Sequence, residues 1–228
     1  MKITKILIGI TTEANVCTET MESIYNLHIP VCVKTDLRII HSYNVADGRN
    51  ELVKMMYAGE YDYIFFVDSD VVLPKNALVD LYEMNWYFTT GTYPRKEKDT
   101  LTKADPFTTL YWHSDSNKDN YCPYFMPFSA LQKGYIIQVD CCGFGCTLVK
   151  KDLFDQLEQP FFFMAHEECA KDDENKDKPY CMGEDMYFCR QVVQKGYQIW
   201  AHGSVQCGHV GRYVYRFPTK EEQEQRNK

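Results

Sequence analysis

The sequence lacks the features that mark several common protein classes. No apolar run approaches the roughly 20 residues of a membrane-spanning helix, so we expect no membrane span. The GxGxxG signature of dinucleotide-binding proteins is also missing. Basic residues are outnumbered by acidic ones, 25 to 32, and the net charge of −7 disfavours a nucleic-acid partner.

The ten cysteines have neither the spacing of a disulfide-stabilised scaffold nor a CxxC metal motif. The adjacent residues Cys141 and Cys142 fit a disulfide framework poorly. Cys169 and Cys181, with His166 nearby, leave a loop zinc site open as the less favoured interpretation. We expect mostly buried, reduced thiols and a cytoplasmic location.

The chain has 228 residues, of which 45% are hydrophobic, so it can form one domain with its own core. Its first 93 residues predict alternating strands and helices. We expect strands at 3–10, 29–40, 62–67 and 86–93, and helices at 17–28, 47–62 and 74–84. Such alternation is typical of a mostly parallel sheet with helices on both faces.

The second half of the chain is less regular. Residues 94–134 show no clear period, and 165–181 form a charged loop. Between them we expect two strand segments broken around Gly143–Gly145, and after them a helix from 183 that leads into a strand. We therefore predict one α/β domain over 1–217, with a Rossmann-like, mostly parallel central sheet, and a solvated tail at 218–228.

In one stretch, "YDYIFFVDSDVVLP" at residues 61–74, an apolar strand is followed directly by two aspartates, Asp68 and Asp70. In an open α/β sheet, ligands collect at the carboxyl ends of the strands. Alternate side chains of an extended chain point the same way, so the two carboxylates can converge on one cation. Oxygen ligands suit Mg²⁺ or Mn²⁺. A solvated turn with two acids is the alternative.

Three further features contribute to the interpretation of this motif. "GED" at Gly183–Asp185 opens a helix, where Asp185 is either a general base or a first-turn acid that stabilises the helix dipole. "CGHVG" places His209 between two glycines as a third metal ligand, with His202 as a competitor. Arg49, near the start of a helix, could meet a phosphate.

The segments "VDSD", "TGTYPRK", "VDCCGFGCTLVKK", "GED" and "CGHVG" together resemble a GT-A-fold glycosyltransferase of the compact bacterial or large-virus type. The similarity covers about residues 6–213. A DxD motif alone is unspecific. A DxD followed by an acidic pair about 115 residues later, and then by a late histidine, is more specific.

The resemblance implies a metal-dependent, inverting hexosyl- or deoxyhexosyltransferase with Mn²⁺ or Mg²⁺. The favoured donor is a UDP-sugar, and the acceptor is a hydroxyl of a glycan or glycoconjugate. Asp70 and His209 would bind the metal, and Asp68 would share it or contact the ribose. Asp185 would be the catalytic base, supported by Glu184. The other implied site residues are Thr11 and Arg49 for the nucleotide and Gly143, Phe144 and Gly145 for the donor or acceptor.

The sequence departs from the family by lacking a "DDGS" segment after its second strand. Two rival functions stay open. A haloacid-dehalogenase-type phosphatase also carries DxD after an apolar strand, with Asp68 as the nucleophile and Val72 at the position of its threonine or valine. A non-catalytic carbohydrate-binding module on a transferase scaffold is the other.

Overall fold

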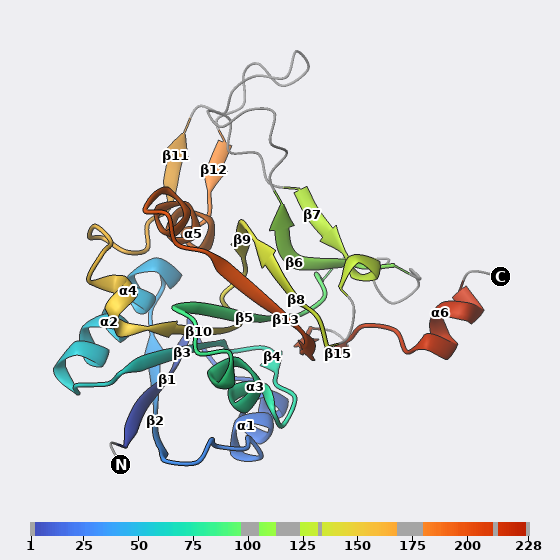
Figure 1. The fold of residues 1–228 in the computed structure, drawn as a ribbon, viewed down its shortest axis with the longest axis horizontal. Helices are drawn as coiled ribbons and strands as arrows, with labels where there is room; N and C mark the ends of the chain where they lie inside the picture. The colour runs from blue at the N-terminus through green and yellow to red at the C-terminus, as the bar shows by residue number, and fades with distance from the viewer. Residues whose placement is uncertain are drawn as a thin grey trace.

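The computed structural model describes residues 3–96, 105–112, 124–131, 134–167, 180–211 and 214–226. Seven strands form the main sheet (Figure 1). In spatial order they are β2 (Val33–His41), β1 (Thr4–Thr12), β3 (Tyr63–Asp68), β10 (Cys146–Lys150), β5 (Phe88–Thr92), β13 (Ile199–Gln206) and β8 (Ile136–Val139).

The main sheet is mixed, so the prediction of a mostly parallel, Rossmann-like sheet is wrong. β1 pairs in parallel with β2 and β3, and β5 pairs in parallel with β13. The pairings β3–β10, β10–β5 and β13–β8 are antiparallel. Two strands from the second half of the chain cause this: β10 enters antiparallel between β3 and β5, and β8 adds antiparallel to β13 at the edge. An apolar run predicts a buried strand but carries no information on its direction.

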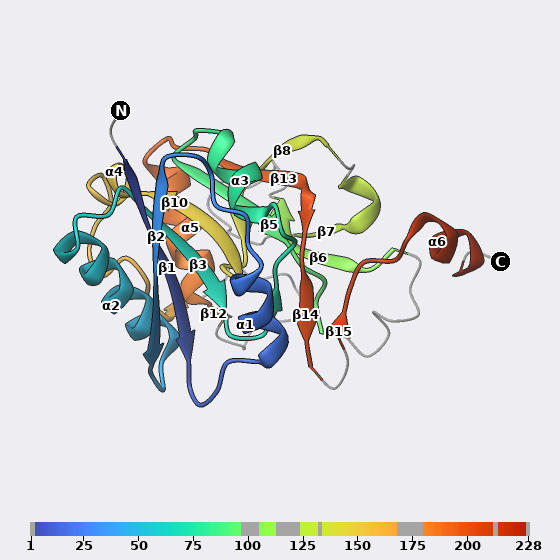
Figure 2. The ribbon, with the colours of Figure 1, turned by 90° about the horizontal axis from the view of Figure 1, so that it is seen from below.

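Helices cover both faces of this sheet (Figure 2). They are α1 (Thr18–Tyr25), α2 (Val45–Ala58), α3 (Ala77–Glu83), α4 (Lys151–Phe154) and α5 (Glu184–Gln194), whereas α6 (Lys220–Arg226) lies apart from the sheet near the C-terminus. The alternation of side chains along β3 divides the core. Ile64 and Phe66 join the cluster under α2, α4 and α5, whereas Phe65 and Val67 join the one under α1 and α3.

Three small sheets complete the described strands. One contains β15 (Val214–Tyr215), β14 (Gly208–Val210) and β4 (Val71–Val72), and a second contains β7 (Tyr124–Pro127), β6 (Phe107–Trp112) and β9 (Cys141–Cys142). The third pairs β11 (Ala165–Glu167) with β12 (Tyr180–Met182). Cys169, part of the alternative zinc site, lies outside the described residues.

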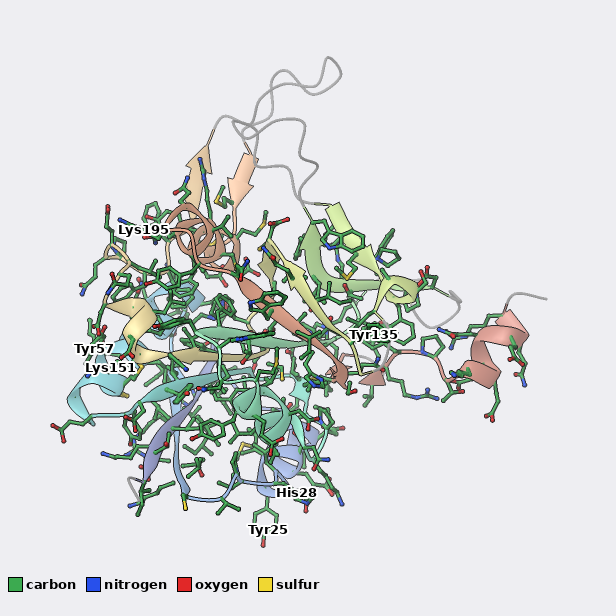
Figure 3. The ribbon with its side chains drawn as sticks, viewed as in Figure 1. Tyr25, His28, Tyr57, Tyr135, Lys151 and Lys195 are labelled. Atoms are coloured by element: carbon green, nitrogen blue, oxygen red, sulfur yellow. The ribbon has the colours of Figure 1, made fainter. Side chains whose placement is uncertain are left out.

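Local contacts fix several elements at the margins. Figure 3 shows Tyr57 of α2 beside Lys151 of α4, and the ammonium of Lys151 lies 5.3 Å from the tyrosine ring centre. The tail contains a helix, α6, which begins with reciprocal bonds between Thr219 and Glu222, a capping box that sequence reasoning missed. None of the described helices has the length and apolar character that a membrane crossing needs.

Candidate functional site

The two aspartates of the DSD motif lie where the sequence places them, at the carboxyl end of β3. Asp68 is the last residue of β3 and pairs in register with Thr11 of β1. Asp70 lies in the turn before β4. The backbone oxygen of Asp70 accepts a hydrogen bond of 2.7 Å from the amide of Val210, so the strand that carries His209 is fixed beside the motif.

Arg49 holds together acids from distant parts of the chain. Its Nη2 lies 3.0 Å from Oδ1 of Asp68, and its Nη1 lies 2.6 Å from Oε1 of Glu184 at the start of α5. We call Arg49, Asp68, Glu184 and the neighbouring Asp185 the Arg49 cluster. Only 5% of the Arg49 side chain is exposed, so both ion pairs form largely away from water. The guanidinium of Arg49 is therefore already paired with two carboxylates, those of Asp68 and Glu184.

Aromatic rings back the Arg49 cluster. The guanidinium carbon lies 5.1 Å from the ring centre of Phe144 and 5.8 Å from that of Phe162, within the range of cation–π attraction. Burial lowers the pKa of Arg49, but the charges of Asp68, Glu184 and Asp185 outweigh it and raise that pKa above its usual value. The arginine therefore stays charged in its apolar setting.

Tyr93 supports Asp68 from the other side. Its hydroxyl donates to Oδ2 of Asp68 at 3.2 Å and accepts from the amide of Gly145 at 3.1 Å. Gly143 and Gly145 make room for this ring, because a Cβ at either position would approach Tyr93 to 2.5–2.6 Å. Burial and the charge of Asp68 raise the pKa of Tyr93 well above its usual range, so the hydroxyl stays a donor.

Asp70, Lys96 and His209 form a second group, the Asp70 cluster. Oδ2 of Asp70 contacts the ammonium of Lys96, and Oδ1 lies 3.5 Å from Nε2 of His209. Nδ1 of His209 lies 3.0 Å from the carbonyl oxygen of Pro94, which can only accept, so Nδ1 carries a proton. Burial opposes the charge of Asp70, but hydrogen bonds from His209 and Lys96 hold its pKa below the usual value.

Asp70 and His209 fit a divalent cation. Nε2 of His209 faces Oδ1 of Asp70, and a histidine that donates its other ring N–H to a carbonyl is a common metal-ligand arrangement. Two atoms that each lie about 2.1 Å from one ion can be up to about 4.2 Å apart, so the 3.5 Å separation allows both to bind it.

Asp68 does not complete a ligand set by itself. Both of its carboxylate oxygens accept hydrogen bonds, from Arg49 and from Tyr93. Over the described residues, no three His, Cys, Asp or Glu side chains gather closely enough to hold a metal. Asp70 and His209 could thus supply two protein ligands to an ion that would take further oxygens from water or from a bound diphosphate.

Asp185 has a strongly shifted pKa. Burial of its carboxyl group, reinforced by the charge of Glu184, raises this pKa to about 6 despite the opposing charge of Arg49. The amide of Met186 donates to Oδ1 at 2.7 Å and fixes the direction of the carboxylate. A Cβ at Gly183 would lie 2.8 Å from the same oxygen, so a larger residue there would displace the carboxylate.

The other predicted residues lie around these clusters. Thr11 is buried, with its methyl group against Gly48 of α2. Phe144 is 1% exposed and packs in the core, so its side chain supports Arg49 and cannot reach a ligand. His202 lies on β13, where its Nδ1 accepts from the amide of Ser204.

Sequence reasoning missed Tyr93 and Lys96. Both lie in "TGTYPRK", a segment that the resemblance includes without giving either residue a role. A strand that ends in a run of polar and aromatic residues was the available signal.

No protein-family model matches the sequence, and no curated protein matches it. A similar solved structure is the crystal structure of A197 from STIV, with 17% sequence identity and a TM-score of 0.57. The similarity covers 94% of this chain and 95% of that chain. At this identity the similarity shows a shared fold, and function has to be argued from the site.

Proposed function

We propose that this protein is a metal-dependent glycosyltransferase that moves a sugar, with inversion, from a nucleoside-diphosphate donor to an acceptor hydroxyl. The observation that carries the proposal is the link that Arg49 makes between Asp68, beside the Asp70 cluster, and the acidic start of α5. The proposed cation site at Asp70 and the proposed base, Asp185, therefore lie at the same edge of the sheet. The family resemblance favours a UDP-sugar donor and a glycan or glycoconjugate acceptor.

Asp185 has the properties of a general base. A carboxyl group with a pKa of about 6 is ionised at neutral pH and is a stronger base than an ordinary aspartate. Oδ1 is engaged by the amide of Met186, whereas Oδ2 receives no hydrogen bond from the described part of the chain. Oδ2 can therefore take the proton of the attacking hydroxyl, while Glu184 stays paired with Arg49.

Asp70 and His209 would hold Mn²⁺ or Mg²⁺, with Asp68 at its side. When bound, such an ion neutralises the charge that develops on a departing diphosphate. Lys96 and Arg49 add positive charge on either side of the aspartates. Asp68 is a poor candidate for a phosphatase nucleophile, because hydrogen bonds occupy both of its oxygens.

Thermal unfolding with UDP and Mn²⁺, with UDP and EDTA, and with neither tests the donor site. A ligand at 100 times its dissociation constant adds about 2.7 kcal/mol to the free energy of unfolding. We expect a rise in melting temperature that needs both UDP and the metal, and that Asp70→Asn abolishes. If UDP, GDP and the other nucleotides all leave the melting temperature unchanged, the proposal is refuted.

Turnover of UDP-sugars tests the base. Asp185→Asn is expected to lower the rate about 10²- to 10⁴-fold, because it removes the proton acceptor, while UDP and Mn²⁺ still bind. Asp47→Asn is the matched control, since Asp47 is an exposed acid in the first turn of α2. Binding without turnover of any donor would instead favour the carbohydrate-binding module, and labelling of Asp68 by a phosphate analogue would favour the phosphatase.

A further inference from the structure

We propose that the Lys96 ammonium stays paired with the Asp70 carboxylate until the donor binds. Lys96 thereby couples binding of the divalent cation at Asp70 to binding of the donor diphosphate. This inference rests on the proposed function and adds a role for a residue outside its ligand set. Lys96 would oppose the cation when it binds alone and favour it when it binds with a diphosphate.

The contact geometry is the first support. The ammonium of Lys96 contacts Oδ2 of Asp70, the same carboxylate whose Oδ1 faces His209. The Lys96 and Asp70 side chains are 32% and 31% exposed, so their ion pair can exchange with ions from solution. Lysine is a compact charge on a flexible stem, which can leave a carboxylate without moving the backbone.

The backbone on the N-terminal side of Lys96 is anchored, so the lysine stem can move while the residues before it stay in place. The amide of Arg95 donates to the carbonyl of Phe107 at 3.2 Å, and the carbonyl of Pro94 accepts from His209. Lys96 thus follows directly after the residues that orient the histidine. Movement of its stem would leave the Asp70–His209 pair in place.

The charges at the site explain the opposition to a lone cation. The two clusters contain four carboxylates, those of Asp68, Asp70, Glu184 and Asp185, and two permanent cations, Arg49 and Lys96. An ion held by Asp70 and His209 would lie close to the Lys96 ammonium, and like charges at short range repel. Removing the Lys96 ammonium makes the net charge of the site more negative and so favours binding of the ion.

A diphosphate reverses the sign of this effect. Its oxygens bring negative charge between the ion and Lys96, and the ammonium can leave Asp70 to pair with them. The cation and the diphosphate then strengthen one another's binding through the lysine. Such a coupling is reciprocal, so UDP must tighten Mn²⁺ binding by the same factor by which Mn²⁺ tightens UDP binding.

The experiment compares the unaltered protein with Lys96→Gln and Lys195→Gln. Lys195, which Figure 3 labels, pairs with Glu158 at 3.2 Å and is the matched surface control. Binding of Mn²⁺ is titrated from the spectroscopic signal of the free ion, with and without UDP. The Mn²⁺–UDP equilibrium in buffer is measured separately, and melting curves check that each variant folds.

We expect Lys96→Gln to bind Mn²⁺ alone about 3- to 10-fold more tightly than the unaltered protein. We expect the factor by which UDP tightens Mn²⁺ binding to fall at least about 5-fold, within the range of typical couplings. Lys195→Gln should change neither quantity. Weaker binding of Mn²⁺ alone by Lys96→Gln, or an unchanged UDP factor, would overturn the inference while leaving the metal site intact. Failure of every protein to bind Mn²⁺, with or without UDP, would overturn the proposed function and the inference with it.

Discussion

The Arg49 cluster and the Asp70 cluster contain the same kinds of charge in different surroundings. The Arg49 side chain is 5% exposed and lies against Phe144 and Phe162, whereas Lys96 is 32% exposed. A buried charge is costly unless its partners stay in place, so the Arg49 cluster is suited to fixed positions. A partly exposed pair costs little to open, so the Asp70 cluster is suited to exchange of ions.

The difference separates two tasks of the proposed enzyme. Fixed dipoles and charges favour a transition state because they need no rearrangement during the reaction, and Asp185 lies in the fixed cluster. Substrate and metal have to enter and leave, and Asp70 with His209 lies in the exchangeable one. Substitutions in the first cluster should therefore change stability, and those in the second should change ligand binding.

Loss of Arg49 should give the largest change in stability. Arg49→Met leaves the carboxylates of Asp68 and Glu184 without their partner, and breaking a buried pair costs about 3 to 5 kcal/mol of unfolding free energy. Urea unfolding at pH 7 measures it.

Lys54→Met is the control for this change. Lys54 lies on the same helix and pairs with Glu51 at 3.0 Å, but its side chain is 75% exposed. Its substitution should cost less than about 0.5 kcal/mol. Equal losses for the two variants would show that the Arg49 cluster is no more tightly built than a surface pair.

Replacement of Asp185 should raise stability at neutral pH. Its pKa is about 6 in the folded chain against an ordinary 3.8, so the folded chain holds this proton more tightly than the unfolded chain. Stability is therefore lost as the pH rises from about 4 to 6. Asp185→Asn removes the ionisation, so this variant should be more stable than the unaltered chain at pH 7, with the difference disappearing near pH 4.

Melting temperatures across this pH range measure the effect, and Asp47→Asn serves as the control. Asp47 is also an acid in a first helical turn, but it is exposed, and its loss should cost about 0.3 to 1 kcal/mol through the helix dipole. The two substitutions should thus differ in sign at pH 7. A destabilised Asp185→Asn would show that Asp185 serves the fold and would weaken its assignment as a base.

Local patterns predicted the elements of the first half well. The strand over 62–67 corresponds to β3, and the helix predicted over 74–84 corresponds to α3, which begins later, at Ala77, because period and turn signals act over a few residues. The direction of β10 could not be predicted in this way, since it depends on which neighbours the strand meets. Asp68 at the end of β3 was predictable for the same local reason.

The partners of Asp68 were not predictable. Arg49 reaches Glu184 across 135 positions, and Tyr93 reaches Asp68 across 25. No local pattern marks such pairs. The phosphate contact expected for Arg49 stays a prediction, and the structure places its guanidinium between two carboxylates. The two glycines of "GFG" were visible, but the ring for which they make room was not.

Tyr93 touches both clusters, so its substitution tests whether they act separately. The hydroxyl donates to Asp68, and the ring meets the His209 ring edge-on with centres 4.9 Å apart. Tyr93→Phe keeps the ring and removes the hydroxyl, leaving the Gly145 amide without its acceptor at a cost of about 1 to 3 kcal/mol. If the clusters are separate, Mn²⁺ affinity should change less than about 3-fold, because His209 keeps its ring contact and its Pro94 bond.

Tyr82→Phe, which loses a hydroxyl bond to Thr4 far from both clusters, is the control for the stability change. A loss of Mn²⁺ affinity of 10-fold or more, as the removal of an orienting partner typically causes, would show instead that Asp68 and the exchangeable half form one ligand unit.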